Sequence, residues 1–210
     1  MRECHARAAG ALVVGMLVTW AGTVAAADAL VGSVLAARGA VFLETAAGQQ
    51  PLTRNAPIHL GDTIVSAEGK AKIALDDGTI VSVGENSRVR VAEFDRSAGD
   101  FKTRASLISG VLRLLVAKVT PAGKFEIETE TAIAAVRGTD WVVEATPERT
   151  SVAIVSGVVA VSSRAEQAPA TVVLDAAGQG TDVRRGSAPT PVAQWGAQRF
   201  ADTVARATFD

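Results

Sequence analysis

Residues 69–91, GKAKIALDDGTIVSVGENSRVRV, alternate apolar and polar side chains over much of their length. Ala71, Ile73 and Leu75 fall on one side of an extended chain, and the lysines beside them fall on the other. A helix would repeat its apolar positions with a period near 3.6 residues, which this stretch does not do. The alternation therefore predicts a strand with one buried face and one solvent-exposed face.

A turn signal follows this strand at Asp76, Asp77 and Gly78. Aspartate side chains hydrogen-bond to nearby backbone, and glycine adopts a positive φ without steric cost. Calcium loops need acidic ligands at a recurring spacing, whereas here one acidic pair precedes one glycine. We therefore interpret the three residues as a plain turn that leads into further strands over residues 79–83 and 88–91.

The same pattern returns further along the chain. Short β-rich segments occur at residues 111–116, 124–129 and 150–163, with turn signals at intervals of roughly eight to ten residues. Residues 28–181 show no sustained helical periodicity. This spacing predicts an all-β domain over residues 28–181, built as a solenoid-like stack of short strands, with a twisted β-sandwich as the alternative.

The N-terminal segment differs from the rest of the chain. Two arginines precede an apolar run over about residues 8–24, and Ala25 and Ala27 supply the small side chains that signal peptidase needs. We expect a signal peptide over residues 1–27, cleavage before Asp28 and export to the periplasm. A retained membrane anchor is the alternative.

Composition excludes several classes of site. Cleavage would remove Cys4, the only cysteine, and would leave His59 as the only histidine, so we expect no cysteine metal site and no zinc site with two histidines. His59 also lacks a nucleophile turn such as G-x-S-x-G. The formal net charge of −1 provides no basic field for a nucleic acid. We expect no catalytic residue, no metal, no cofactor and no nucleic-acid partner.

Residues 134–145, AAVRGTDWVVEA, combine strand-forming residues with an arginine, a glycine and an aspartate around a tryptophan. Alternation after Gly138 predicts that a strand begins there and buries the ring of Trp141. Arg137 could then pair with Asp140 or a neighbouring carboxylate across the turn. The alternative is a ligand site in which the tryptophan stacks on the ligand and the arginine binds an anion.

Four stretches, taken in order, resemble the FecR domain family of bacterial envelope proteins. HLGDTIVSAEGKAKIALDDGTIVSVGENSRVRV is followed by SLISGVLRLLV, by FEIETETAIAAVRGTDWVVEA and by TSVAIVSGVVAVSS. The third stretch resembles the family's strand F-x-V-x-T leading into GT-x-F-x-V, with tryptophan where phenylalanine is common. The resemblance covers residues 32–181. The signature positions, which we interpret as structural, are Gly61, Asp62, Gly78, Gly110, Gly138, Thr139, Trp141 and Gly157.

The resemblance implies a non-enzymatic module that works through other proteins. The best-known family members form the periplasmic part of transmembrane regulators, which receive a signal from an outer-membrane transporter and control a sigma factor. Here only about seven residues precede the apolar run, too few for a folded sigma-binding module. We therefore expect contact with a membrane sensor, transporter or envelope assembly, and no direct contact with a sigma factor.

A loop and a helix are expected over residues 182–210. Thr190 could cap a helix that opens at Pro191, because proline is tolerated at the first helical position. We interpret this helix as a cap on the open end of the β-structure, with partner docking as the alternative. The candidate partner contacts on the chain are Arg137, Asp140, Trp195 and Phe200.

Glycan binding and enzymatic activity would each require features that the sequence can be searched for. Peptidoglycan or polysaccharide binding would need exposed aromatic side chains, but the chain has no tyrosine and most of its phenylalanines are expected to face inward. A β-helical enzyme would need a strip of carboxylates, for which Glu126, Glu128 and Glu130 are the nearest approximation. We interpret those three as a solvated strand edge. Glycan binding stays as the alternative function.

Overall fold

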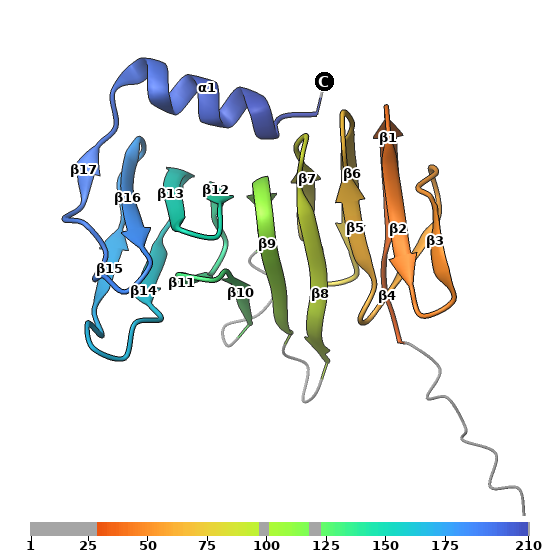
Figure 1. Ribbon diagram of the computed structural model, residues 1–210, viewed down its shortest axis with the longest axis horizontal. Coiled ribbons are helices and arrows are strands. Elements are labelled where there is room, and N and C mark those ends of the chain that lie inside the picture. The colour runs from red at the N-terminus through yellow and green to blue at the C-terminus, as the bar shows by residue number, and fades with distance from the viewer. Residues whose placement is uncertain (1–28, 97–100, 118–122, 210) are drawn as a thin grey trace, which may run out of the picture.

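The computed structural model describes residues 29–96, 101–117 and 123–209 (Figure 1). The expected signal peptide lies outside them. The first strands are β1 (Leu30–Arg38), β2 (Val41–Thr45), β3 (Gly48–Pro51), β4 (Pro57–His59), β5 (Thr63–Ser66), β6 (Lys70–Leu75), β7 (Ile80–Val83) and β8 (Arg88–Asp95). They are followed by β9 (Lys102–Leu115), β10 (Lys124–Glu128), β11 (Ala132–Val136), β12 (Asp140–Ala145), β13 (Arg149–Ser156), β14 (Val159–Ser163), β15 (Thr171–Leu174), β16 (Gln179–Arg184), β17 (Ala193–Gln194) and the helix α1 (Ala197–Ala207).

The strands form two layers. One, which we call the helix-side layer, runs in the order β4, β1, β6, β7, β9, β12, β13, β16 and β17. The other, the opposite layer, runs in the order β3, β2, β5, β8, β9, β10, β11, β14 and β15. Strand β9 belongs to both, so the described strands form one continuous sheet.

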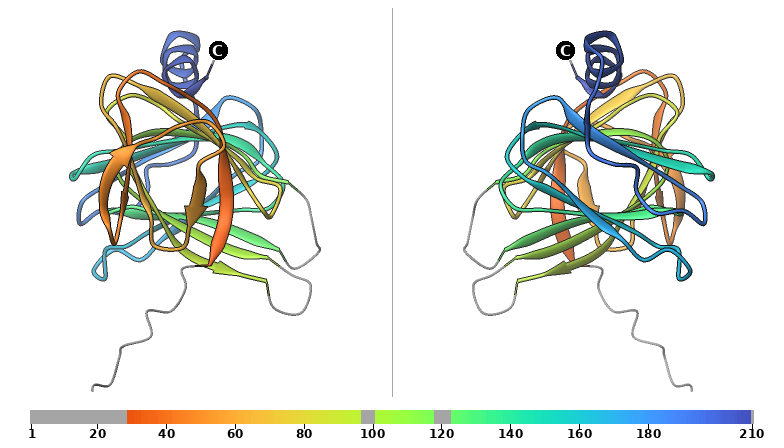
Figure 2. Two further views of the ribbon diagram at one scale, coloured as in Figure 1. Left: turned by 90° about the vertical axis from the view of Figure 1, so that its right-hand side faces the viewer. Right: turned by 90° about the vertical axis from the view of Figure 1, so that its left-hand side faces the viewer.

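The chain advances along the long axis of the molecule while alternating between the layers. Strand β1 lies near one end and β16 near the other in Figure 1, and the end-on views in Figure 2 show strands on either side of the core. Neighbouring strands are antiparallel except β9 and β10, which are parallel. The predicted all-β, solenoid-like stack is confirmed, because the chain advances along one axis. The two layers also face one another as in a sandwich.

The buried faces follow the predicted alternation. Ala71, Ile73 and Leu75 all lie in the core, and so do the inward residues of the other predicted strands. Trp141 is the largest fully buried side chain, with 0% of its surface exposed. Burial of these one-sided strand faces against one another supplies the main driving force for the fold.

Strand β9 bends from one layer into the other at Gly110, and this bend requires glycine. Its φ is +99°, a region that side chains disfavour. A Cβ at this position would lie 2.3 Å from the Cα of Ser87. Ser87 is itself buried, and its hydroxyl oxygen accepts a hydrogen bond from the N–H of Val111 at 2.9 Å. The close fit of Gly110 on Ser87 therefore fixes where β9 changes layers.

The C-terminal helix begins later than predicted. Pro191 does not open it, because residues 193–194 first add the short strand β17 to the sheet and Gly196 is the N-cap residue. Thr190 serves the sheet instead: its hydroxyl accepts a hydrogen bond from the N–H of Asp182 at 3.0 Å. Backbone pairing with β16 thus replaces the helical turn that Pro191 would have favoured.

The position of α1 also differs from the prediction. It does not cover the open end of the β-structure but lies against the outer face of the helix-side layer, with its axis along the molecule (Figure 2). Phe200 and Val204 pack with Trp195 against Val142 and Ala153. Val142 was expected to face solvent, and the helix is the reason that it is buried. No helix within the described ranges has the length and apolar character needed to cross a bilayer.

Candidate functional site

The corner formed by residues 134–145 is built around Thr139. Strand β11 ends at Val136, Gly138 turns the chain with a φ of +65°, and β12 begins at Asp140. The Thr139 hydroxyl donates to the carbonyl oxygen of Val158 at 2.9 Å and accepts from the N–H of the same residue at 3.2 Å. This double contact ties the corner to the β13–β14 turn, which gives Thr139 a structural role.

Trp141 cannot serve as a stacking platform for a ligand. Its ring is fully buried, as the alternation predicted, and its indole Nε1 has no hydrogen-bond partner among the described residues. An unpartnered buried N–H destabilises the fold by about 1–3 kcal/mol, which the ring's apolar burial must outweigh. The alternative interpretation, a ligand site formed by arginine, aspartate and tryptophan, would need an exposed ring that Trp141 does not provide.

The expected pair between Arg137 and Asp140 does not form. Asp140 instead accepts two hydrogen bonds from Arg113 of β9, at 3.0 and 2.8 Å. The hydrogen bond to Asp140 raises the pKa of Arg113 further above its usual range, so the arginine stays charged. Arg137 is exposed, and within the described ranges it has no ion pair. It remains a candidate partner contact, whereas Asp140 is already engaged.

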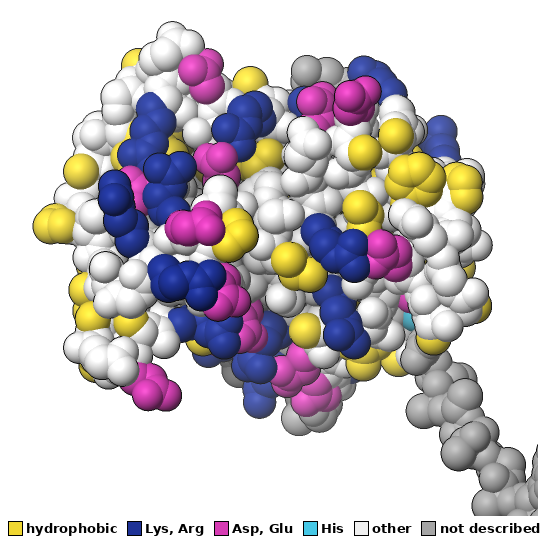
Figure 3. Space-filling view, viewed as in Figure 1, with side chains coloured by type: hydrophobic (Ala, Val, Ile, Leu, Met, Phe, Trp, Pro, Cys, Tyr) yellow, Lys and Arg dark blue, Asp and Glu magenta, His cyan; other side chains and the backbone are white. Residues whose placement is uncertain are grey.

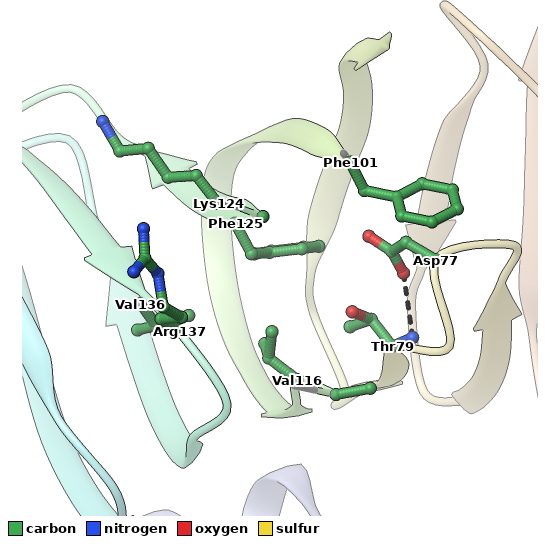
Figure 4. A pocket seen from close by; sticks show the side chains of 10 residues that line it. Asp77, Thr79, Phe101, Val116, Lys124, Phe125, Val136 and Arg137 are labelled. Carbon is green, nitrogen blue, oxygen red and sulfur yellow. Dashed lines mark hydrogen bonds between the residues drawn. The ribbon is translucent and has the colours of Figure 1, made fainter. Parts of the chain in front are cut away.

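A small pocket lies beside Arg137 (Figure 4). Figure 4 shows Arg137 and Lys124 on one side of it and Phe101 and Asp77 on the other. Its enclosed space is about 20 Å³, room for about one water molecule. The carboxylate of Asp77 is occupied, because it accepts hydrogen bonds from the N–H of Thr79 at 2.8 Å and from the hydroxyl of Thr103 at 2.7 Å. The pocket therefore suits no substrate, and Asp77 shapes the turn as predicted.

Asp62 and Gly61 have structural roles in the turn before β5. Asp62 is buried, and its Oδ2 accepts a hydrogen bond from the N–H of His59 at 2.8 Å. Gly61 and Gly78 both have a positive φ, as their places in turns require. Gly157 does so at the β13–β14 turn, packed on Thr139. No group of three or more metal-ligating side chains is found among the residues that the structure describes.

The three glutamates interpreted as a solvated strand edge all carry ion pairs, and only Glu130 among them is exposed. Strand β10 lies between β9 and β11, and each carboxylate contacts an arginine. These contacts join Glu126 to Arg104 at 3.0 Å, Glu128 to Arg164 at 3.1 Å and Glu130 to Arg185 at 3.1 Å. Glu126 also contacts Lys124. The carboxylates therefore stabilise the outer face of the opposite layer and are not free for acid–base chemistry.

The ion pairs of Glu126 should make the free energy of unfolding depend on pH in the acid range. Burial alone would raise its pKa, but hydrogen bonds from Lys124 and Arg104 outweigh burial and lower the pKa. A carboxylate with a lowered folded-state pKa stabilises the protein above its unfolded pKa of about 4.3, and this contribution is lost as the pH falls. We expect E126Q to be less stable than the unmodified chain at pH 6, by a difference that shrinks below about pH 4.3.

Urea unfolding at several pH values between about 3 and 6 measures this difference. Glu148 is the matched control, because it is exposed in a loop and has no ion pair among the described residues. E148Q should match the unmodified chain throughout. A stability difference for E126Q that stays constant down to pH 3 would contradict the assignment.

Trp195 is buried beside α1, whereas Phe200 packs against it and stays partly exposed. Trp195 is 8% exposed, and its ring lies so close to Gly180 that a Cβ there would be 2.2 Å from the indole nitrogen. The guanidinium of Arg199 stacks 3.6 Å from the same ring. Both aromatic residues thus hold α1 on the sheet, which leaves little of Trp195 for a partner, while Phe200 remains a candidate partner contact. The sequence marked both residues as contacts but did not indicate that the surface they contact belongs to the same chain.

Comparison with known families gives one match. The model of the family described as FecR protein matches residues 62–160. Residues 62–160 form a FecR domain. Strands β5 to β14 lie within or across these bounds, so the FecR domain contains the Thr139 corner, the β9 bend and the Glu126 ion pairs. A FecR domain supports a signalling or regulatory role.

Two solved structures share the fold of this FecR domain protein. Both are crystal structures of a proposed anti-sigma factor from Parabacteroides distasonis, at 1.65 and 2.50 Å resolution. They are 20% and 19% identical to this chain, with a TM-score of 0.52 each. The match covers 65% of this chain and 61% of theirs, less than two thirds of their length. A comparison with curated proteins gave no significant match.

Proposed function

We propose that this chain is a periplasmic, non-enzymatic binding and signalling module of the FecR type. It acts by protein–protein contact with a membrane sensor, a transporter or an envelope assembly. The observation that carries the proposal is the FecR domain over residues 62–160, whose buried and paired charged groups serve the fold. The solved anti-sigma factor with the same fold is consistent with a regulatory role for this architecture.

The arrangement of carboxylates supports binding in preference to catalysis. Acid–base catalysis needs a carboxyl group with a free reactive oxygen in a cleft. In the described ranges Glu126, Asp140 and Asp182 each contact an arginine. Burial would raise the pKa of Asp182, but hydrogen bonds from Arg199 and Ser151 outweigh it and lower the pKa. The lowered pKa values favour the ionised forms of Glu126 and Asp182, and the ion pairs hold strands and helix together.

Export is part of the proposal and rests on the sequence of residues 1–27. Expression of the full chain in a Gram-negative host should give a periplasmic product whose first residue is Asp28. N-terminal sequencing of that product is the measurement. A product that keeps Met1 and stays in the cytoplasm would contradict periplasmic action.

Glycan binding remains a second candidate because of one observation. Five of the six phenylalanines are partly exposed, not inward-facing as expected, and only Phe125 is buried. Phe94 and Phe101 form a tilted pair with ring centroids 6.2 Å apart, and Arg96 lies over the Phe94 ring. Partly exposed rings beside a cation can stack on sugars, so peptidoglycan or polysaccharide is the alternative ligand.

Affinity capture from solubilised envelopes tests the two functions against each other. The full chain should recover one membrane or envelope protein specifically and should not sediment with purified peptidoglycan. Sedimentation with peptidoglycan and no recovered protein would replace the proposed function with the glycan alternative. Because Arg137 and Arg54 are both exposed, R137E and R54E form a matched pair. Loss of recovery with R137E alone would place the contact at the Thr139 corner.

A further inference from the structure

A row of side chains crosses the outer face of the helix-side layer beside α1. The strand registers place Ala74 of β6 opposite Ile80, Ile80 opposite Leu115, and Leu115 opposite Asp140 of β12. Leu115 is 56% exposed, although it lies in the middle of the layer between β7 and β12. An exposed leucine at the centre of a sheet face is a position that another element could cover.

The helix α1 covers the neighbouring part of the same face. It lies over Val142, against which Phe200 and Val204 pack, and over Glu144, which pairs with Arg206 at 2.7 Å. These positions are two and four residues beyond Asp140 on β12, which is about 7 and 14 Å along the strand. The axis of α1 thus lies about 10 Å from the Leu115 row. Packed helices are about 8–10 Å apart, so a second helix fits on this row beside α1.

A hollow of about 230 Å³ adjoins the row. Ile80 and Leu115 form its apolar floor, and Phe209 follows α1 and lines its wall. A hollow of this kind accepts a large apolar side chain from a docked element. We call the Leu115 row, together with this hollow, the helix-side trough.

The charge at the helix-side trough is positive. Lys72 and Arg113 both line the hollow. Arg113 is neutralised by Asp140, whereas Lys72 has no ion pair among the described residues. Under α1 the arrangement is reversed: the sheet supplies the carboxylates of Asp182 and Glu144, and the helix supplies arginines. An element docked in the helix-side trough would therefore be complementary if it carried a carboxylate near Lys72.

We infer that the helix-side trough docks an amphipathic helix of the partner protein. Its apolar side packs on Ile80 and Leu115, and one of its carboxylates pairs with Lys72. A second copy of this chain fits poorly, because α1 stands about 10 Å above the sheet and keeps two such faces apart. The inference rests on the proposed function and specifies the surface and the chemistry of the contact.

Fluorescence anisotropy with two synthetic peptides tests this inference on the purified chain. Both are amphipathic helices about four turns long with leucines on one side, flanked by glutamates in one and by lysines in the other. The acidic peptide should bind more tightly than the basic one. L115E should weaken acidic-peptide binding by about tenfold or more, and K72E should reverse the preference between the peptides.

The control is V173E on the opposite layer, since Val173 is 51% exposed and resembles Leu115 in exposure. It should leave binding unchanged, and all three variants should keep the circular dichroism spectrum of the parent. Three results would overturn the inference: no binding of either peptide, equal losses with L115E and V173E, or a chain dimer in sedimentation that L115E dissociates.

The same variants separate this inference from the proposed function. If the chain captures an envelope protein and L115E captures it equally well, the helix-side trough is not the contact, although the function stands. If no envelope protein is captured while the acidic peptide binds as expected, the proposed function fails and the surface assignment stands.

Discussion

Replacing Trp141 with alanine is expected to lower the free energy of unfolding by about 3–5 kcal/mol. The ring is fully buried between the layers at the start of β12, and alanine would leave a cavity that the surrounding strands cannot close. Urea unfolding followed by circular dichroism measures the loss as a lower midpoint with an unchanged slope. A loss below about 1 kcal/mol would contradict the central position of this ring.

The control for this substitution is Trp141→Phe. Phenylalanine is smaller, which costs packing, but it removes the indole N–H that has no partner among the described residues. These effects have opposite signs, so W141F should lose at most about half as much as W141A. Equal losses for both would show that the indole nitrogen makes a stabilising contact.

Gly110→Ala is expected to be the second most damaging substitution. The φ of +99° costs a side chain about 1 kcal/mol or more, and the added Cβ would approach the Cα of Ser87 to 2.3 Å. Strand β9 cannot shift to relieve this contact, since it pairs with β7 and β12 in one layer and with β8 and β10 in the other. We expect a loss of at least about 3 kcal/mol or failure to fold.

Gly186→Ala separates the cost of a positive φ from the cost of the steric contact with Ser87. Gly186 also has a positive φ, of +72°, but a Cβ there would meet nothing within 4 Å. The free energy of unfolding of G186A should therefore fall only by the backbone cost of a positive φ, about 1 kcal/mol. Thermal unfolding of both variants measures the difference. Similar losses for G110A and G186A would mean that the contact with Ser87 does not fix the bend of β9.

The strands of the FecR domain could be predicted from sequence because one face of each is buried. Ala71, Ile73 and Leu75 show this alternation within a single short segment, and β6 contains all three of them. Alternation does not predict burial when another element covers the outer face of a strand. Val142 lies on the face predicted to be solvent-exposed, yet α1 covers it.

Side-chain pairing depends on which strands are neighbours and in what register, and the alternation within one strand does not show either. Arg137 and Asp140 are close in sequence, but β12 pairs with β9 so that Arg113 lies beside Asp140. Buried hydroxyl contacts are equally hard to predict. The hydroxyl of Thr150 lies 2.6 Å from that of Thr129, although Thr150 is on β13 of the helix-side layer and Thr129 follows β10 of the opposite layer.

The candidate contact surfaces were only partly predictable. Trp195 and Phe200 are candidate contacts by sequence, but an apolar side chain gives the same sequence signal whether it packs on its own chain or on a partner. Leu115 gave no signal in sequence, because it alternates with the buried Leu112 and Leu114 as any outward residue would. Leu115 becomes a candidate contact only in the structure, where the strand register aligns it with Ile80 and α1 packs on the neighbouring part of the same face.

Photo-crosslinking in cells tests the central claim most directly, that this FecR domain protein acts by contact with another protein of the envelope. A photoreactive phenylalanine analogue would replace Leu115, Arg137 or Val173 of the full exported chain, one position at a time, so that both layers are sampled. On the face drawn in Figure 3, basic and acidic side chains lie interspersed. The account predicts one dominant cross-linked envelope protein, obtained most strongly from position 115. Absence of any protein adduct from all three positions would contradict it.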